Sequence, residues 1–315
     1  MRLIAGGVAL EVEVHGRDDA EPLLLIMGLG MQLLGWPDGL VDQLVQAGFR
    51  VIRFDNRDVG LSQDFDDAGV PNLGLQALRH ALQLRVESAY SLADMAGDTV
   101  AVLDALGIES SHVCGASMGG MVAQHVAARH PQRVRSLTLM MTTSGAKRTP
   151  GPTWPVRSAL LSKPRTADDI DAVVAHYQRF FRVIGSPAFP TDPEVVGQQV
   201  RQATKRSWRP AGTLRQMLAI AADGDRTPLL RTIRVPTRIV HGSADPMLPP
   251  ACAFDLASKI DGAGLDLIEG MGHDLPEALW PRFVTAIASA AQRAAPLRTG
   301  TPTSAASRRD PDSAA

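Results

Sequence analysis

A serine between two glycines is the residue of this chain best suited to covalent chemistry. Ser117 lies in the run 115–120, which reads GASMGG, between an apolar pair typical of a strand and a run, 121–128, typical of a helix. A tight strand-to-helix turn needs small residues two positions before and after the serine, because a Cβ there would clash. The pattern therefore predicts an exposed nucleophile. The N-terminal N–H groups of the helix would face a developing oxyanion.

An acid and a histidine follow the serine in the chain. Asp245 ends a loop after the apolar strand predicted from residue 237, and His273 lies on a glycine-rich loop after the strand predicted over 264–269. His273 would take the proton from Ser117, while Asp245 would hold the imidazole in the required tautomer. His241, at a strand end, is interpreted as structural. No H-x-x-H or H-E-x-x-H spacing occurs, so we expect no metal site.

The order Ser117, Asp245, His273 resembles that of the α/β-hydrolase superfamily. The resemblance runs over about 10–294 and includes three further motifs: LLLIMG at 23–28, DNRDVGLS at 55–62 and HGSAD at 241–245. Within the superfamily, the pairing of Met27-Gly28 with Gly35-Trp36-Pro37 and the Arg-Asp-x-Gly-x-Ser run is similar to the anthracycline methyl-esterase type. The acid of some members follows the next strand instead. Here that position reads TTS at 142–144, which favours Asp245.

The resemblance implies an oxyanion hole made of two backbone N–H groups. One belongs to the residue after the nucleophile, Met118, and the other to the loop after the predicted strand 23–27. By position that second donor is Leu29. Many relatives carry His-Gly where this chain has Met27-Gly28, which removes a polar side chain but leaves the backbone donor. The chemistry needs no cofactor.

Composition is that of an ordinary globular protein. The 315 residues are 45% hydrophobic and 21% charged, with a net charge of −1, which gives no reason to expect nucleic acid or a membrane as partner. Cys114 and Cys252 read as buried residues rather than a disulfide framework. The first residues lack a long apolar run, so we expect a cytoplasmic protein.

Strands and helices alternate along the chain, which predicts a mostly parallel, doubly wound α/β sheet with helices on both faces. Asp98 lies on the predicted helix 92–106 and is expected to be solvated, and the loop 55–62 is expected to support the site. The predicted elements are a hairpin over 2–5 and 8–15, strands over 23–27, 50–55, 113–116 and 134–141, and helices over 36–47 and 92–106.

The alternation breaks between residues 145 and 235. This proline-rich segment has helical runs near 166–181, 193–205 and 213–222, and it falls where the superfamily inserts a helical cap. We therefore expect a hydrolase core over 1–144 and 236–294, a cap over 145–235, and a disordered tail over 295–315.

The cap segment, residues 145–235, is basic. It holds 15 Lys or Arg against 7 Asp or Glu. Such a surplus would attract anionic substrates or form a solvated helical face. Six methionines near the site motifs suit an adaptable apolar pocket or ordinary core filling. They are Met27, Met31, Met118, Met121, Met247 and Met271.

These features predict a serine hydrolase that cleaves a carboxylic ester of a small to medium apolar substrate through an acyl-serine intermediate. The partner would be a small-molecule ester. Four alternatives remain open. The same triad serves C–C bond hydrolases, acyltransferases and cofactor-free perhydrolases, and a non-catalytic ligand receptor could keep it as a relic.

Overall fold

One sheet organises the molecule. The structure is a computed structural model that describes residues 1–82, 84–166 and 169–294. Its eight strands lie in the order β1-β2-β4-β3-β5-β6-β7-β8. Their bounds are β1 Arg2–Ala5, β2 Val8–His15, β3 Glu21–Ile26, β4 Phe49–Phe54, β5 Ser111–Ala116, β6 Val134–Met140, β7 Thr237–Gly242 and β8 Gly264–Ile268.

The sheet is mostly parallel, as predicted. Strands β1 and β2 form the expected hairpin, and β2 runs antiparallel to β4. From β4 to β8 every neighbouring pair is parallel. The carboxyl ends of β5, β7 and β8 therefore meet at one edge of the sheet, and these are the ends that precede Ser117, Asp245 and His273.

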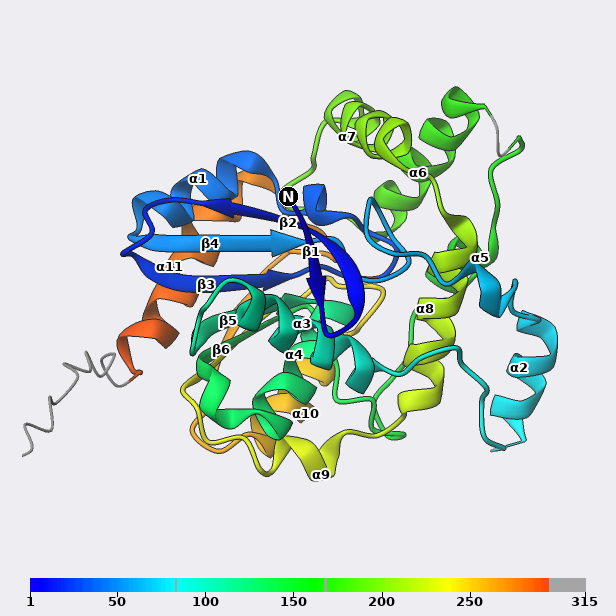
Figure 1. Ribbon diagram of the computed structural model, residues 1–315. Helices are drawn as coiled ribbons and strands as arrows, with labels where there is room; N and C mark the ends of the chain where they lie inside the picture. The colour runs from blue at the N-terminus through cyan, green and yellow to red at the C-terminus, as the bar shows by residue number, and fades with distance from the viewer. Residues whose placement is uncertain (83, 167–168, 295–315) are drawn as a thin grey trace, which may run out of the picture.

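Helices cover both faces of the sheet (Figure 1). On one face α1 and α11 pack over a cluster that includes Leu40, Leu44 and Phe283. On the other, α3, α4 and α10 bury a second cluster that includes Met95, Val122 and Leu256. These helices span α1 Asp38–Gln46, α3 Leu92–Ala105, α4 Met118–Arg129, α10 Ala251–Lys259 and α11 Trp280–Gln292.

One polar residue of α3 departs from expectation. Asp98, predicted to be solvated, is 5% exposed. Its two carboxylate oxygens accept hydrogen bonds from Nε and Nη2 of Arg57 at 2.6 and 2.7 Å. The expectation was wrong because the loop after β4 folds over this helix and brings Arg57, an exact bidentate donor for a carboxylate, onto it.

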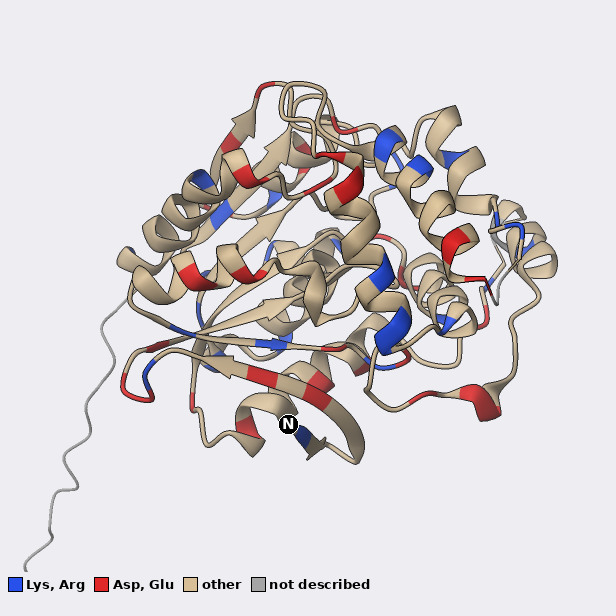
Figure 2. Ribbon diagram, turned by 90° about the horizontal axis from the view of Figure 1, so that it is seen from above, with Lys and Arg blue, Asp and Glu red and all other residues tan. Residues whose placement is uncertain are grey.

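Among the residues that the structure describes, five helices lie between β6 and β7, and α5 to α8 stand beyond the carboxyl ends of the parallel strands (Figure 1). Helices α6, α7 and α8 match the three predicted helical runs. Basic residues recur along this segment (Figure 2). Helix α2, Leu73–Ala81, lies in the connection between β4 and α3. The five helices are α5 Trp154–Leu161, α6 Ile170–Ile184, α7 Pro193–Arg206, α8 Pro210–Asp223 and α9 Thr227–Leu230.

The division into core and cap stays a prediction, and the predicted tail 295–315 lies outside the described residues. Both cysteines are buried and free. In the described ranges, no helix combines the length and apolarity that crossing a membrane requires.

Candidate active site

The backbone of Ser117 is strained. Its φ of 54° and ψ of −119° place it in a region that non-glycine residues rarely occupy. The residue joins the end of β5 to the start of α4, and its own N–H and C=O are both held. The N–H donates to the carbonyl of Met140 at 2.9 Å, and the carbonyl accepts from Oγ1 of Thr142 at 2.7 Å. These contacts fix the strained turn, as expected where strain serves a function.

Close backbone contacts exclude a side chain at Gly115 and at Gly119, the glycines on either side of Ser117. A Cβ on Gly115 would lie 2.3 Å from the carbonyl oxygen of Gly119, and one on Gly119 would lie 2.0 Å from that of Ile26. Such distances are far inside van der Waals contact. The turn after β5 therefore packs so closely against itself and against β3 that no side chain fits at either position.

The three predicted triad residues meet. His273 Nε2 lies 3.0 Å from Ser117 Oγ, and His273 Nδ1 lies 2.7 Å from Asp245 Oδ2. Both Asp245 and His273 are buried, at 3% and 7% exposure, while Ser117 is partly exposed. The distance of 3.0 Å between His273 Nε2 and Ser117 Oγ is in the range in which a base can take a proton from a hydroxyl. A serine, an imidazole and a carboxylate thus form one continuous chain of hydrogen bonds.

The loop that carries Asp245 holds its carboxylate from the other side. Asp245 Oδ1 accepts the backbone N–H groups of Met247 and Leu248 at 2.9 and 2.8 Å. The remaining oxygen is thereby left for His273. The neighbouring His241 is fully buried, and its Nε2 donates to the carbonyl of Leu248 at 2.7 Å. Burial lowers the pKa of His241, so this ring stays neutral beside the carboxylate.

The loop after β3 lies against the serine. A Cβ on Gly28 would be 3.2 Å from Ser117 Cβ and 3.8 Å from Ser117 Oγ. Leu29, the next residue, is the predicted oxyanion donor, and no described loop hydrogen bond takes up its N–H. Met118 is the first residue of α4, so its N–H has no carbonyl one turn back in the helix. Both predicted donors therefore belong to segments that adjoin the serine.

Two side chains that the sequence did not single out hold this loop. Asn56 Nδ2 donates to the carbonyl of Met27 at 3.0 Å. Gln216 of α8 accepts the N–H of Gly30 at 2.8 Å and donates to the carbonyl of Arg57 at 2.8 Å. Asn56 lies within the DNRDVGLS motif, which was expected to support the site. Nothing in the local sequence marks Gln216.

Four of the six methionines near the site are core residues. Met118 and Met121 belong to one buried cluster, and Met27 and Met271 to the other. Of the two earlier interpretations, core filling therefore applies to these four.

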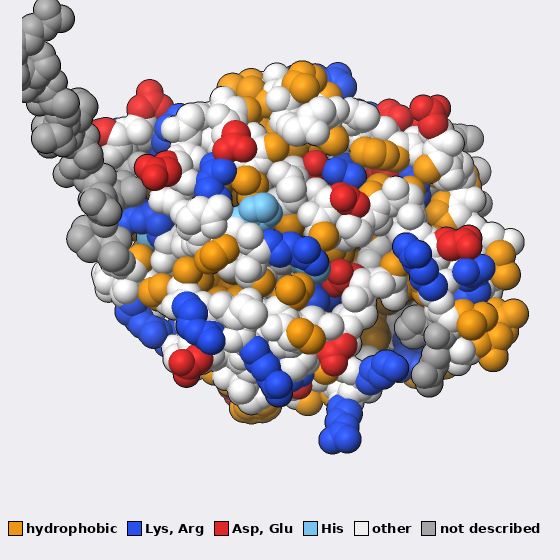
Figure 3. All heavy atoms as spheres, turned by 60° about the horizontal axis from the view of Figure 1, so that its bottom comes forward, with side chains coloured by type: hydrophobic (Ala, Val, Ile, Leu, Met, Phe, Trp, Pro, Cys, Tyr) orange, Lys and Arg blue, Asp and Glu red, His pale blue; other side chains and the backbone are white. Residues whose placement is uncertain are grey.

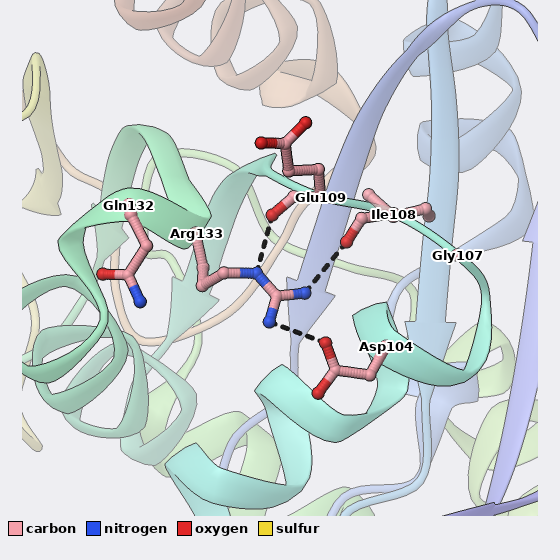
Figure 4. Close-up of a pocket in the computed structure, with 6 residues that line it drawn as sticks. All are labelled: Asp104, Gly107, Ile108, Glu109, Gln132 and Arg133. Carbon is pink, nitrogen blue, oxygen red and sulfur yellow. Dashed lines mark hydrogen bonds and ion pairs between the residues drawn. The ribbon is translucent and has the colours of Figure 1, made fainter.

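A hollow of about 450 Å³ lies elsewhere on the molecule (Figure 4). It is lined by residues that precede β5 and β6, at the sheet edge opposite Ser117. Arg133 there donates to the carbonyls of Ile108 and Glu109 and pairs with Asp104 at 2.7 Å. The guanidinium of Arg133 thus already has protein partners, and we assign this hollow no role in binding.

On the face shown in Figure 3, basic and acidic side chains are interspersed.

Comparison with known proteins places this chain in a family. The sequence profile of the alpha/beta hydrolase fold matches residues 21–276. Rhodomycin D methylesterase DauP of Streptomyces sp. (strain C5) is 29% identical over 303 residues, covering 89% of this chain and 94% of that protein. The 3-oxoadipate enol-lactonase 1 of Acinetobacter baylyi is 26% identical, covering 76% and 77%.

Solved structures agree in fold. The enol-lactonase from Burkholderia xenovorans LB400 superposes with a TM-score of 0.67 at 22% identity, covering 93% of this chain and all of that one. The family profile spans most of the chain, and the fold agrees with it. The chain belongs to the alpha/beta hydrolase fold family.

Proposed function

We propose that this chain hydrolyses carboxylic esters through an acyl-serine intermediate. The observation that carries the proposal is the hydrogen-bond chain from Ser117 through His273 to Asp245. The similarity to proteins named as methylesterase and enol-lactonase supports the ester as substrate. The substrate we infer is an ester of small to medium size and apolar character.

In this mechanism Ser117 Oγ attacks the ester carbonyl while His273 Nε2 takes its proton. The negative charge that develops on the carbonyl oxygen is met by the N–H groups of Leu29 and Met118, each donor supplying about 10²–10³-fold in rate. His273 then gives the proton to the leaving alcohol. It next activates a water that releases the acid and regenerates the serine. Asp245 keeps the imidazole oriented and stabilises its protonated form.

The test combines covalent labelling with turnover. The native protein is treated with a fluorophosphonate probe and assayed on p-nitrophenyl esters from acetate to palmitate. Ser117→Ala should abolish labelling and lower turnover by about 10⁴–10⁶-fold, because loss of a triad member removes the acyl-enzyme route. Ser158→Ala, at an exposed position of α5, is the matched control and should behave as the native protein does.

The outcomes separate the alternatives. Turnover of Ser117→Ala above about a hundredth of the native rate would overturn the nucleophile. Labelling without ester turnover would favour C–C bond hydrolysis, and peroxide-dependent halide oxidation would favour a perhydrolase. Ester turnover that yields acylated alcohol in place of acid would favour an acyltransferase. Retained ligand with a single slow turnover would favour a receptor.

A further inference from the structure

The loop that carries the base is held by the cap segment. This histidine loop, residues 270–274, lies against residues 184–188, which begin at the last residue of α6. The N–H of His273 donates to the carbonyl of Ile184 at 2.7 Å, and the N–H of Ala188 donates to the carbonyl of Gly270 at 3.1 Å. A Cβ on Gly272 would lie 2.4 Å from the carbonyl oxygen of Gly185, so the two backbones touch. The backbone position of the base therefore depends on α6.

One side-chain pair lies at the centre of this contact. Ser186 is 3% exposed, and its Oγ donates to Asp274 Oδ1 at 2.5 Å while accepting the N–H of Gly272 at 2.8 Å. Its backbone N–H approaches Asp274 Oδ2 at 3.3 Å. The hydroxyl thus bridges the residues immediately before and after His273. The ester mechanism uses neither Ser186 nor Asp274.

The carboxylate of Asp274 is partly buried, and burial raises its pKa. The hydrogen bonds from Ser186 act in the opposite direction and favour the ionised form. The other titratable groups around the imidazole are Asp245, on its Nδ1, and His241, which lies 3.6 Å from Asp245 Oδ2. Ser186 thus holds the side chain of the residue that directly follows the base.

We propose that Ser186 and Asp274 are positioning residues through which the cap segment sets the orientation of His273. This inference rests on the proposed function, because it concerns the base of that reaction. Trimming the cap segment to alter substrate choice would also remove Ile184 and Ser186 from the base, so point substitutions are the sharper probe.

The experiment compares Ser186→Ala, Asp274→Ala and the conservative Asp274→Asn with the native protein in kcat and KM on one p-nitrophenyl ester. Loss of either partner should lower kcat by about 10–100-fold with little change in KM, through misplacement of the base. Asp274→Asn keeps an acceptor for Ser186 and should recover most of that loss. Asp261→Asn, exposed in the turn before β8, is the matched control.

A second readout needs no substrate. The downfield NMR resonance of the His273 Nδ1 proton, which reports the contact with Asp245, is recorded for the native protein and for the variants. Its chemical shift should change in Ser186→Ala and Asp274→Ala and stay in Asp261→Asn. A resonance at the native position in both variants would overturn the proposal, even if kcat fell.

The two proposals fail differently. If the native protein shows no Ser117-dependent turnover, the proposed function is wrong, and the NMR resonance still decides whether Ser186 and Asp274 position His273. If turnover depends on Ser117 but the resonances of the variants coincide with the native one, only the positioning role is wrong. Should Asp274→Ala fail to fold, Ser186→Ala supplies both measurements.

Discussion

Two histidines lie within reach of one carboxylate, and their surroundings give them different roles. His273 occupies the middle of a hydrogen-bond chain that runs from Asp245 to the partly exposed hydroxyl of Ser117. His241 is fully buried and uses its Nε2 proton on the carbonyl of Leu248. Removing the His241 Nε2 proton would leave the buried carbonyl of Leu248 without its hydrogen-bond donor, which is energetically unfavourable. His241 therefore acts as packing and hydrogen-bonding support for the loop that carries Asp245.

This contrast predicts unequal losses on substitution. Asp245→Asn should lower kcat by about 10⁴-fold with little change in KM, because an asparagine favours the wrong imidazole tautomer. His241→Gln should cost far less in kcat, since the glutamine can still donate to Leu248. Steady-state kinetics on one p-nitrophenyl ester measures both. If His241→Gln were the more damaging of the two, the acid and the base would be wrongly assigned.

At the scale of elements, the basic surplus of the cap segment has a structural use. Arg215 of α8 pairs with Asp58 at 2.7 Å and with Asp66 at 2.6 Å. Arg206 of α7 pairs with Asp55 at 2.6 Å. These acids lie in the connection after β4, so opposite charges join the cap segment to the rest of the molecule. Part of the surplus is thus neutralised internally, a use that neither earlier interpretation of the basic charge had foreseen.

Removing one partner of the buried Arg215–Asp58 pair should strongly destabilise the fold. In Arg215→Met the fully buried Asp58 loses its guanidinium, which should lower the free energy of unfolding by about 3–5 kcal/mol. Arg201→Met breaks an exposed pair with Asp171 and should cost about 0–1 kcal/mol. Urea unfolding of the two variants gives the comparison. Equal losses would mean that Arg215 does not join α8 to the loop.

Helices and strands could be predicted where apolar residues recur at helical or strand spacing and turn residues stand at both ends of the segment. The predicted strand 134–141 and helix 92–106 each differ from β6 and α3 by one residue. Helix α5 was not predicted, because prolines interrupt its segment and Trp154 and Leu161 remain exposed. Its pattern therefore lacks the apolar face that marks a helix.

The site could be predicted only as far as local motifs reach. Ser117, Asp245 and His273 each lie in a turn that follows a strand, so each has a local sequence signal. Ser186 and Asp274 are 88 positions apart, and Arg215 and Asp58 are 157 apart. Such pairs have no local pattern, since only the packed helices bring them together.

For the molecule as a whole, buried histidines set the response to acid. Burial lowers the pKa of His112, His176 and His241. His112 shows the reason most clearly. Its Nδ1 lies 2.8 Å from Ser136 Oγ and its Nε2 lies 2.9 Å from Glu21, so the neutral ring is already fully hydrogen-bonded. Protonation would place a positive charge in a buried strand, away from water.

The sign of the resulting pH dependence follows from linkage. Below about pH 6.5 the unfolded chain protonates these histidines while the folded chain does not, so the free energy of unfolding falls as pH falls through that window. Burial raises the pKa of Asp55, Asp98 and Asp274, which acts in the opposite direction. A difference between variants therefore isolates the histidine contribution better than the native curve does.

We predict that His112→Gln reduces the decrease in the free energy of unfolding at acid pH and leaves catalysis unchanged. The variant keeps polar partners for Ser136 and Glu21, and its position at the start of β5 is at the sheet edge opposite Ser117. Between pH 7.5 and 5.5, its free energy of unfolding should fall by about 1 kcal/mol less than that of the native protein, because one titrating group has been removed. Thermal unfolding at both pH values measures this. His130→Gln, at a partly exposed position, should follow the native curve. A native and a His112→Gln curve that stay parallel from pH 7.5 to 5.5 would show that His112 is not held neutral by the fold.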